Sequence, residues 1–394
     1  MKHKLRTCMN GILKKFFSLL LITTFSLVFN NTVTAQDTTV NSKLRISVLT
    51  CDAGDDLYTI WGHTAVRVVD SINNTDYVFN FGSFDFSTPN FIAKFMKGDL
   101  MYFISATTYT NFLYEYTARN VHEQELKLTP SEKEKWYQEL QVNMIGNNRF
   151  YLYNFITDNC TTRIKDGLFK HAPINGYSIR IHSFREEVVS ATYKGGLGWV
   201  GLGIDLLLGA VSDQTPNLNQ EAFLPKLLYQ KIALNPKLVL SSKDTQYNNK
   251  PQGKETSPIT YLILVLVLYI FVSNWNSLIT QRIARVLDIS LLLFFGIGGA
   301  LVLYMSQFSF HNACHENYNL IWLHPLYLLA IPVYFLSKKW TGYMGWLFFT
   351  ATTLLMFASH WIPQHFSKSV IVIMILALCL QIRLIKRGRL AKYK

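Results

Sequence analysis

The apolar positions of this chain follow two different patterns that meet near Pro258. Before Pro258, short segments alternate apolar and polar residues, as strands with one buried face do. Strands are predicted for Leu44–Cys51, Ala65–Val69, Tyr77–Phe81, Leu100–Ala106 and Val121–Leu128. Asn73-Asn74 suits a hairpin turn between the second and third of these strands.

Two helices are expected after the strands. Thr129-Pro130-Ser131-Glu132 has the form of a capping box with proline at the first helical position, and it predicts a helix to about Asn143. Asp158 or Asn159 can cap a second helix that begins near Cys160 and ends near Phe169. Clustered strands followed by late helices indicate an α+β domain.

The region after Pro258 is mostly apolar and predicts an all-α membrane domain. We expect five transmembrane helices, at about Ile259–Trp275, Val286–Met305, Leu320–Leu336, Tyr343–Ser359 and Val370–Ile385. Several of these segments are shorter than the roughly 20 residues that a bilayer needs, so their ends must extend into the interface. Tryptophans at those ends suit an aromatic belt: Trp275, Trp322, Trp340 and Trp361.

The loops between these segments predict an orientation. If residues 36–257 lie outside, the cytoplasmic side holds Arg282, Arg285, the Lys338-Lys339 pair and the basic C-terminus. The outward loops then contain a single lysine or arginine, Lys368. This positive-inside pattern requires five spans. It places the first domain on the outer side of the membrane.

The N-terminus predicts export. Basic residues precede an apolar stretch from Phe16 to Phe29, and Val33-Thr34-Ala35 suits signal-peptidase cleavage after Ala35. A retained anchor is the alternative. Cys8 precedes the apolar stretch, so it is not the lipid-modified cysteine of a lipobox.

The expected domains are a signal peptide at 1–35, an exported domain at 36–200, a connecting part at 201–257 and the membrane domain at 258–394. Within the connecting part, Asn219–Leu234 is amphipathic and Ser241–Ser257 is a polar linker. Gly195–Val211 is apolar and rich in glycine. It is either an interfacial segment on the bilayer or a buried loop with a short helix.

Composition and charge narrow the class of protein. The chain has 394 residues, of which 49% are apolar, and a mean hydropathy of +0.15. These values exclude a disordered chain and argue against a wholly soluble enzyme. The net charge of +13 comes with many basic residues beside the apolar segments, which indicates membrane topology and excludes nucleic-acid binding as a first interpretation.

The candidate chemistry lies in two phrases. His63 in Trp61-Gly62-His63-Thr64 stands at the start of a predicted strand, and Cys160 in Asp158-Asn159-Cys160-Thr161 stands at a predicted helix N-terminus. The helix dipole and a nearby imidazole both lower a thiol pKa, and the imidazole can then move protons. A helix-start cysteine paired with a strand histidine is the papain-like arrangement, here with the histidine first, as in circularly permuted papain-like folds.

Two alternatives remain at this stage. Cys160 and His63 could each be an ordinary structural residue, since single cysteines are often buried apolar fillers. Alternatively, Cys51 and Cys160 could form a disulfide in the exported domain.

Longer phrases carry a family resemblance. They are Leu49–Gly54, Trp61–Arg67, Phe79–Phe86, Asp158–Arg163, Phe223–Pro225 and Asn317–Pro325. With these phrases the chain resembles the Lnb-type lipoprotein N-acyltransferases over nearly the whole mature length. More distantly it is similar to permuted lipid-active enzymes of the lecithin:retinol acyltransferase type, so an NlpC/P60-like or lecithin:retinol acyltransferase-like exported domain is expected.

The resemblance implies a reaction. An acyl chain would move from a phospholipid through a Cys160 thioester to the α-amino group of a diacylglyceryl-cysteine lipoprotein. His63 would protonate the leaving alkoxide and then deprotonate the amine. Asp85 and Asn80, on or just after the next strand, are equal candidates for the group that orients His63.

Further residues are candidates for substrate contact. Arg163 or Arg67 could bind lipid phosphate, and the backbone N–H of Cys160 with a donor from Tyr58–Trp61 could form an oxyanion hole. Asn319 and His324 lie in the family-like phrase of the membrane domain and suggest a substrate cleft there.

No cofactor or metal is predicted, because no glycine-rich phosphate loop, paired-carboxylate motif or strong zinc spacing is present. An outward loop contains His311, Cys314, His315 and Glu316, which are a weak metal-site pattern, lipid-headgroup contacts or ordinary interfacial residues.

Three other functions compete. A Cys/His amidase or peptidase of the cell wall or of peptides shares the fold, although such an enzyme needs at most one membrane anchor. A phospholipase differs only in using water as the acyl acceptor. A binding or sensing protein would leave Cys160 inert, so that Cys160→Ser would preserve its function.

Overall fold

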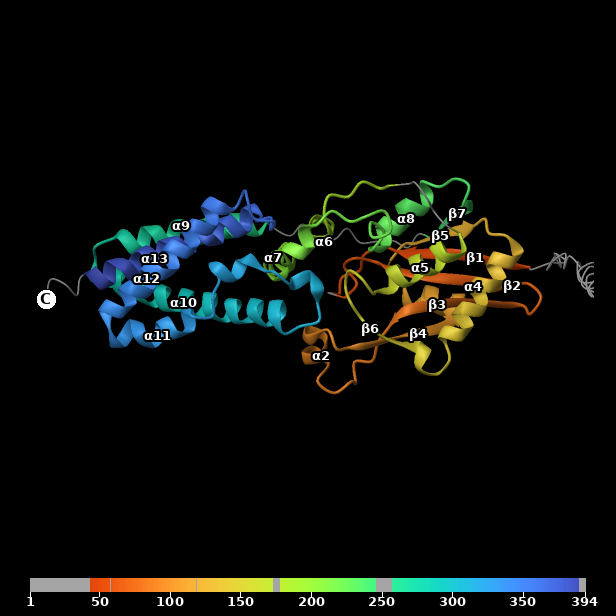
Figure 1. Cartoon of the computed structure of the whole chain (residues 1–394), viewed down its shortest axis with the longest axis horizontal. Coiled ribbons are helices and arrows are strands. Elements are labelled where there is room, and N and C mark those ends of the chain that lie inside the picture. The colour runs from red at the N-terminus through yellow and green to blue at the C-terminus, as the bar shows by residue number, and fades with distance from the viewer. Residues whose placement is uncertain (1–42, 57, 118, 173–177, 246–256, 390–394) are drawn as a thin grey trace, which may run out of the picture. The chain divides into compact units, whose positions relative to one another are not determined.

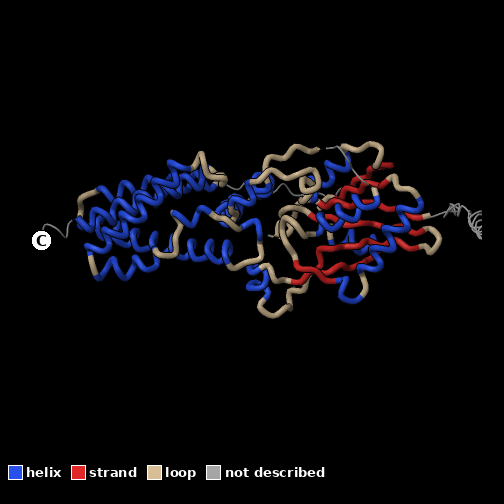
Figure 2. The backbone as a smooth tube through the Cα atoms, viewed as in Figure 1, coloured by secondary structure: helices blue, strands red, loops and turns tan. Residues whose placement is uncertain are grey.

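The structure is a computed structural model that describes residues 43–56, 58–117, 119–172, 178–245 and 257–389. The predicted signal peptide and its cleavage site lie outside these residues. Ser42–Lys394 belong to one compact unit. Within it, the described strands are confined to the first part of the chain and the part after Ser257 is helical (Figure 2).

A seven-stranded antiparallel sheet organises the first part, with the order β6-β4-β3-β2-β1-β5-β7 (Figure 1). Its strands are β1 Leu44–Cys51, β2 His63–Asp70, β3 Thr75–Ser83, β4 Met101–Thr108, β5 Val121–Leu126, β6 Phe150–Leu152 and β7 Val239–Thr245. All five predicted strands are present. Asn74 has a left-handed φ of 50° in the expected turn between β2 and β3.

The strands missed by the sequence are the two edges of the sheet. β6 has only three residues, and β7 is polar and largely exposed. β7 occupies the start of the segment that we expected to be a linker, and it pairs with β5. The sheet therefore uses residues beyond the boundary expected at residue 200.

Helices cover both faces of the sheet. α4, α5 and α8 pack on one face, where Trp136, Ile164 and Leu228 join a core with Val48 and Val66. α3 packs on the other face through Phe112 and Tyr116. The helices of this part are α2 Phe91–Lys97, α3 Tyr109–Glu115, α4 Pro130–Asn143, η1 Gly146–Arg149, α5 Cys160–His171, α6 Phe184–Lys194, α7 Gly198–Leu207, η2 Ala210–Asp213 and α8 Pro225–Ala233.

The predicted helix starts are confirmed. Thr129 and Glu132 form the capping box of α4, with Pro130 in the first turn. Asn159, one of the two expected caps, begins α5 at Cys160. Both helices therefore start where the side-chain chemistry of their caps dictates.

The glycine-rich segment forms a short helix. α7 buries Gly198, Gly201 and Leu202, and the small residues allow close packing: a Cβ on Gly201 would come within 2.9 Å of Tyr193. The amphipathic segment after it becomes α8, which begins only at Pro225 because proline is favoured at the first helical position.

Five helices follow in the membrane part: α9 Pro258–Asn274, α10 Leu278–Gln307, α11 Tyr327–Leu336, α12 Lys338–Ala358 and α13 Lys368–Arg389, with η3 Asn312–Cys314 and η4 Tyr318–Ile321 between α10 and α11. Among the described helices, α10 and α13 are long and apolar enough to cross a membrane by length and composition. α10 begins earlier than predicted because Ser277 and Thr280 form a capping box, so the basic residues after it are helical.

Candidate active site

His63 is the first residue of β2, and the residue before it determines how the chain enters the strand. Gly62 has a φ of +84°, a conformation that favours glycine, and a Cβ there would lie 2.6 Å from the backbone oxygen of Cys51. Cys51 is also the register partner of His63 across β1 and β2. A tight glycine turn therefore holds His63 at the end of the sheet.

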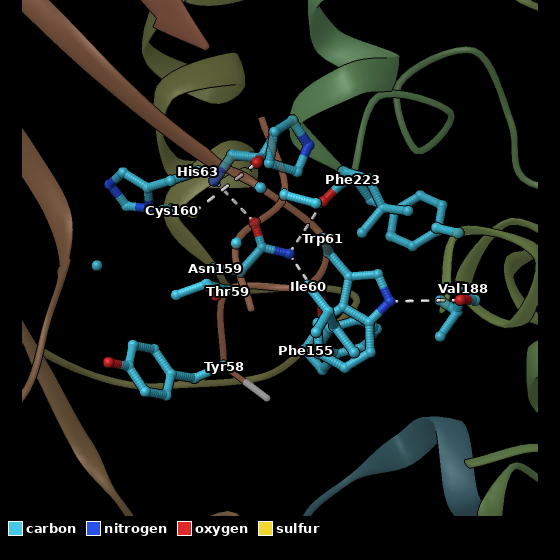
Figure 3. A pocket seen from close by; sticks show the side chains of 18 of the residues that line it. Tyr58, Thr59, Ile60, Trp61, His63, Phe155, Asn159, Cys160, Val188 and Phe223 are labelled. Carbon is cyan, nitrogen blue, oxygen red and sulfur yellow. Dashed lines mark hydrogen bonds between the residues drawn. The ribbon is translucent and has the colours of Figure 1, made fainter. Parts of the chain in front are cut away.

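Cys160 is the first residue of α5, and Asn159 fixes it there. Asn159 Oδ1 accepts hydrogen bonds from the backbone N–H groups of Thr161 (2.8 Å) and Thr162 (2.9 Å). Its amide nitrogen donates to the backbone oxygens of Phe155 and Phe223 (Figure 3). The side chain of Asn159 thus connects the start of α5 to the loop before it and to Phe223.

A buried contact holds α5 against β2. The hydroxyl oxygens of Thr64 and Thr161 are 3.0 Å apart, and each threonine directly follows one of the two candidate residues. His63 and Cys160, 97 positions apart in the sequence, are brought together at the wall of one pocket (Figure 3).

The surroundings of Cys160 favour its thiolate. Burial raises the pKa of the thiol, but the charge of His63 and a hydrogen bond from its ring lower it. The backbone N–H of Thr64 and the hydroxyl of Thr161 lower it further, and the net pKa of Cys160 lies below its ordinary value. The thiolate is the nucleophilic form of a cysteine, so these surroundings suit a nucleophile.

Asn80 fixes the orientation of the His63 ring. Its Oδ1 lies 2.8 Å from His63 Nε2 and accepts a 2.7 Å hydrogen bond from the backbone N–H of Gly82. Because a backbone N–H only donates, the atom facing it must be the amide oxygen. His63 Nε2 must then carry a proton, which leaves Nδ1 as the basic nitrogen available to Cys160.

Aromatic rings surround the pair. The His63 ring stacks on Tyr116 with centroids 5.6 Å apart. Tyr102 and Tyr153 stack at 4.3 Å and line the same cavity. Burial raises the pKa of both tyrosines, and the nearby Cys160 adds to the rise, so their hydroxyls remain protonated. Sequence reasoning missed them, because Tyr102 lies in an alternating strand, where a tyrosine looks like a core residue, and Tyr153 follows the short strand β6, which was itself not predicted.

The side-chain hydrogen bonds of Asp85 are to Ser87 and not to His63. Its carboxylate accepts hydrogen bonds from the backbone N–H and the hydroxyl of Ser87 in an exposed turn. Those bonds lower the pKa of Asp85. Of the two residues that the sequence left open, the structure places Asn80 against the His63 ring.

Both candidate arginines are engaged by carboxylates. The Arg67 guanidinium contacts Asp76 (2.6 Å) and Glu123 (2.9 Å) and is largely buried. Arg163 forms two hydrogen bonds with Asp158, at 2.5 and 2.7 Å. Neither arginine lines the cavity that contains Cys160.

Of the three remaining candidates for substrate contact, one lines the cavity and two do not. Tyr58 lines the cavity and is 55% exposed. Asn319 is buried, donates to the Leu206 oxygen and accepts from Trp322 Nε1. His324 Nδ1 accepts from the backbone N–H of Leu326. The last two lie outside the cavity lining, so the structure brings only Tyr58 to the candidate site.

The disulfide alternative is wrong. Cys51 and Cys160 are both free, and burial raises the pKa of Cys51 above its ordinary value. In the loop between α10 and α11, His311 Nε2 contacts the Phe95 oxygen and His315 Nε2 contacts the Ser309 oxygen. No metal-binding group of three or more histidine, cysteine or acidic residues occurs among the described residues.

The candidate site opens into a cavity of about 2460 Å³. Small-molecule pockets measure roughly 300–1,000 Å³, so this space suits a larger substrate. Much of its wall is apolar, and the apolar lining includes Phe84, Phe86, Phe91, Ile92, Phe95, Met96, Val200, Ile204, Leu207, Leu301 and Met305. Cys160 and His63 therefore face a large space whose wall is mostly apolar.

Family comparisons agree with this organisation. Residues 31–183 match the Lnb N-terminal periplasmic domain, and residues 250–394 match the Lnb transmembrane domain. No curated protein and no solved structure matches the chain significantly. The chain therefore belongs to the Lnb family, as a membrane protein in which an N-terminal periplasmic domain precedes a transmembrane domain.

Proposed function

We propose that this protein is a lipoprotein N-acyltransferase. It moves an acyl chain from a glycerophospholipid to Cys160, and from Cys160 to the α-amino group of a diacylglyceryl-cysteine lipoprotein. The observation that carries this proposal is the activated Cys160–His63 pair at the wall of a large, mostly apolar cavity. Membership of the Lnb family supports a membrane enzyme of lipoprotein processing.

In the first half of the reaction, the Cys160 thiolate attacks the carbonyl carbon of a phospholipid ester. A C–S bond forms, and the C–O bond to glycerol breaks. The protonated His63 ring gives its Nδ1 proton to the leaving alkoxide. The products are a Cys160 thioester and a lysophospholipid.

In the second half, the neutral α-amino group of the lipoprotein attacks the thioester carbonyl. His63 Nδ1 takes the proton that the amine loses, and the Cys160 thiolate leaves as the amide forms. Asn80 keeps the ring in the required tautomer through both halves because its oxygen holds the proton on Nε2.

Stabilisation of the tetrahedral oxyanion is assigned to the backbone N–H of Cys160 and a donor from the loop of Tyr58–Trp61. Both segments line the cavity. Tyr58, exposed at its mouth, is the proposed substrate contact. The apolar wall limits access of water, which would otherwise hydrolyse the thioester.

The fold proposal is a circularly permuted papain-like domain, supported by a histidine on β2 that precedes the helix-start cysteine of α5. We also propose five membrane crossings in a bacterial inner membrane, with the site on the periplasmic side. The basic residues near the start of α10 (Arg282 and Arg285), at the start of α12 and at the end of α13 then lie in the cytoplasm.

The test is the intact mass of the purified protein after incubation with phospholipid, before and after neutral hydroxylamine. We expect a fatty-acyl mass that hydroxylamine removes, that is absent in Cys160→Ala and that persists in Cys379→Ala, a matched control in α13. A diacylglyceryl lipopeptide should then gain an amide-linked chain. Lysophospholipid and free fatty acid without the amide would indicate a phospholipase. Absence of both adduct and lysophospholipid would favour an amide hydrolase.

A further inference from the structure

The short helix α2 has an unusual surface. Its seven residues, FIAKFMK, include no buried residue, although five of them are apolar. Ile92 is 72% exposed and Phe95 is 42% exposed, and the nearby Phe86 is 63% exposed. The charged residues of α2 are both basic, Lys94 and Lys97. An apolar surface of this kind on an exported domain indicates an interaction site.

α2 is also part of the cavity wall. Phe91, Ile92, Phe95 and Met96 line the cavity that contains Cys160. Phe86 and Phe91 pack together with centroids 5.1 Å apart. The exposed apolar surface of α2 is therefore continuous with the inside of the candidate site.

The segment that follows α10 holds α2 in place. The backbone N–H of Phe310 donates to the Lys97 oxygen (2.7 Å), and His311 Nε2 lies 2.8 Å from the Phe95 oxygen. Lys97 Nζ lies 5.4 Å from the centroid of the Phe310 ring. Phe308 and Phe310 are themselves exposed.

α10 connects this surface to the bilayer. It is one of the two described helices that can cross a membrane by length and composition, and it ends at Gln307, directly before Phe308. Leu301 and Met305, in its last two turns, line the cavity. The apolar surface thus continues from a membrane helix to α2 and into the candidate site.

We propose that α2 and Phe308–His311 form a lip through which an acyl chain of a membrane glycerophospholipid passes from the bilayer to Cys160. The inference rests on the proposed function for the fate of the chain. Two features favour lipid over a protein partner: the continuity with α10, and Lys94 on α2, which suits a lipid phosphate, whereas Lys97 is paired with Asp99 at 3.5 Å. Aromatic residues at the end of a membrane helix are typical of the interface.

The experiment uses the full chain reconstituted in vesicles of phosphatidylethanolamine and phosphatidylglycerol, doped with a phosphatidylethanolamine that carries a diazirine at the end of one acyl chain. After illumination, crosslinked peptides are mapped by mass spectrometry. We expect crosslinks in residues 91–97 and 308–311, in the wild type and in Cys160→Ala alike. Crosslinks confined to the membrane helices would overturn the lip.

Variants test whether the lip controls entry. Phe308→Ser with Phe310→Ser should slow formation of the Cys160 adduct from vesicle phospholipid about tenfold, because the lip loses apolar contact with the chain while the cavity lining is unchanged. Reaction with water-soluble p-nitrophenyl butyrate in detergent should change less than about twofold, since a short ester reaches Cys160 without crossing the apolar lip. Ile72→Ser, which removes an equally exposed side chain from the β2–β3 turn, is the matched control.

The outcomes separate the two proposals. Equal loss with both substrates, or no loss with either, would contradict the lip. Crosslinks at the lip without any acyl adduct on Cys160 would leave the lip standing and contradict the proposed acyl transfer.

Discussion

At the residue scale, the amide oxygen of Asn80 determines which nitrogen of His63 carries a proton. It lies between two donors, His63 Nε2 and the backbone N–H of Gly82, and so fixes which ring nitrogen faces the cysteine. The sequence could not separate Asn80 from Asp85, because both stand on or just after one strand. The β3–β4 register shift between Asn80 and Ser83 redirects the side chains there, and such irregularities leave little trace in the alternation of residue types.

Replacement of Asn80 should therefore affect chemistry more than folding. Asn80→Ala should slow formation of the Cys160 adduct roughly ten- to hundredfold, as expected from the about 1–3 kcal/mol lost when a buried hydrogen-bond partner is removed. The measurement is the rate of acyl-adduct formation by mass spectrometry. Asp85→Ala, which removes only contacts within an exposed turn, is the control. The reverse ranking of the two variants would show that Asp85 is the orienting group.

A second prediction concerns the reactivity of Cys160 with pH. Its pKa lies below the ordinary thiol value, so it deprotonates at a lower pH than a free cysteine and its reactivity is lost as the pH falls through that lowered pKa. The alkylation rate with iodoacetamide, followed by peptide mapping across a pH series, should therefore have its midpoint at a lower pH than that of a free cysteine in a reference peptide.

The cause can be tested in the same series. His63→Ala removes the charge and hydrogen bond that lower the pKa, so the midpoint should move to higher pH. Cys314 is the internal control, because burial raises its pKa to about 12 and it should stay unmodified. An unchanged midpoint in His63→Ala would mean that the imidazole does not activate Cys160.

At the scale of elements, the site depends on close packing at strand ends. A Cβ on Gly82 would lie 2.5 Å from His63 Cε1, closer than any ordinary contact. Gly82→Ala should displace the ring and slow adduct formation by about a hundredfold, since misplacement by about 1 Å has that effect. Gly298→Ala, whose Cβ meets Leu323 at an ordinary 3.5 Å, should react normally. A full rate in Gly82→Ala would show that the ring position is unimportant.

The same packing explains what the sequence could and could not predict about the elements. The starts of α4 and α5 follow from local capping chemistry, and the capping residues Thr129 and Asn159 can be recognised in the sequence. β7 could not be predicted, because an exposed edge strand needs no apolar alternation and owes its existence to pairing with β5. The ion pair between Arg67 and Glu123 could not be predicted either, since Glu123 lies two strands away in the sheet.

At the scale of the whole molecule, one buried ion pair connects four helices of the membrane part. Asp288 of α10 accepts two hydrogen bonds from Arg383 of α13, at 2.8 and 3.0 Å. Tyr269 of α9 and Tyr334 of α11 donate to the same carboxylate. A charge in such a place is costly unless it is paired, so we infer that the pair helps to specify how the helices assemble.

Breaking that pair should destabilise the helical part. Asp288→Ala leaves Arg383 without its partner and should cost about 3–5 kcal/mol, measured as unfolding of the detergent-solubilised protein. Replacement of both residues by leucine should recover much of the loss. Asp166→Asn, at an exposed carboxylate on α5, should have almost no effect. Equal stability of Asp288→Ala and the wild type would mean that the ion pair does not stabilise the assembly of the helices.

The number of membrane crossings is the last question at this scale, and it depends on α11. Its ten residues extend about 15 Å, half of the roughly 30 Å hydrocarbon thickness. The segment before it continues through η4, so a crossing at α11 needs irregular backbone that is buried in protein. Asn317 and Asn319 supply such cover, because both donate to backbone oxygens at the end of α7. We therefore expect α11 to cross with these residues as part of the span.

Accessibility to a membrane-impermeant maleimide tests this topology in spheroplasts, in a chain whose native cysteines are replaced by serine. His360→Cys, after α12, should be labelled from outside. Asn276→Cys, before α10, and Lys339→Cys, at the start of α12, should be labelled only after permeabilisation. If α11 instead enters and leaves on the same side, Lys339→Cys becomes accessible from outside and His360→Cys becomes protected. Asn276→Cys stays protected in both cases, so the comparison isolates α11 and decides between five crossings and four.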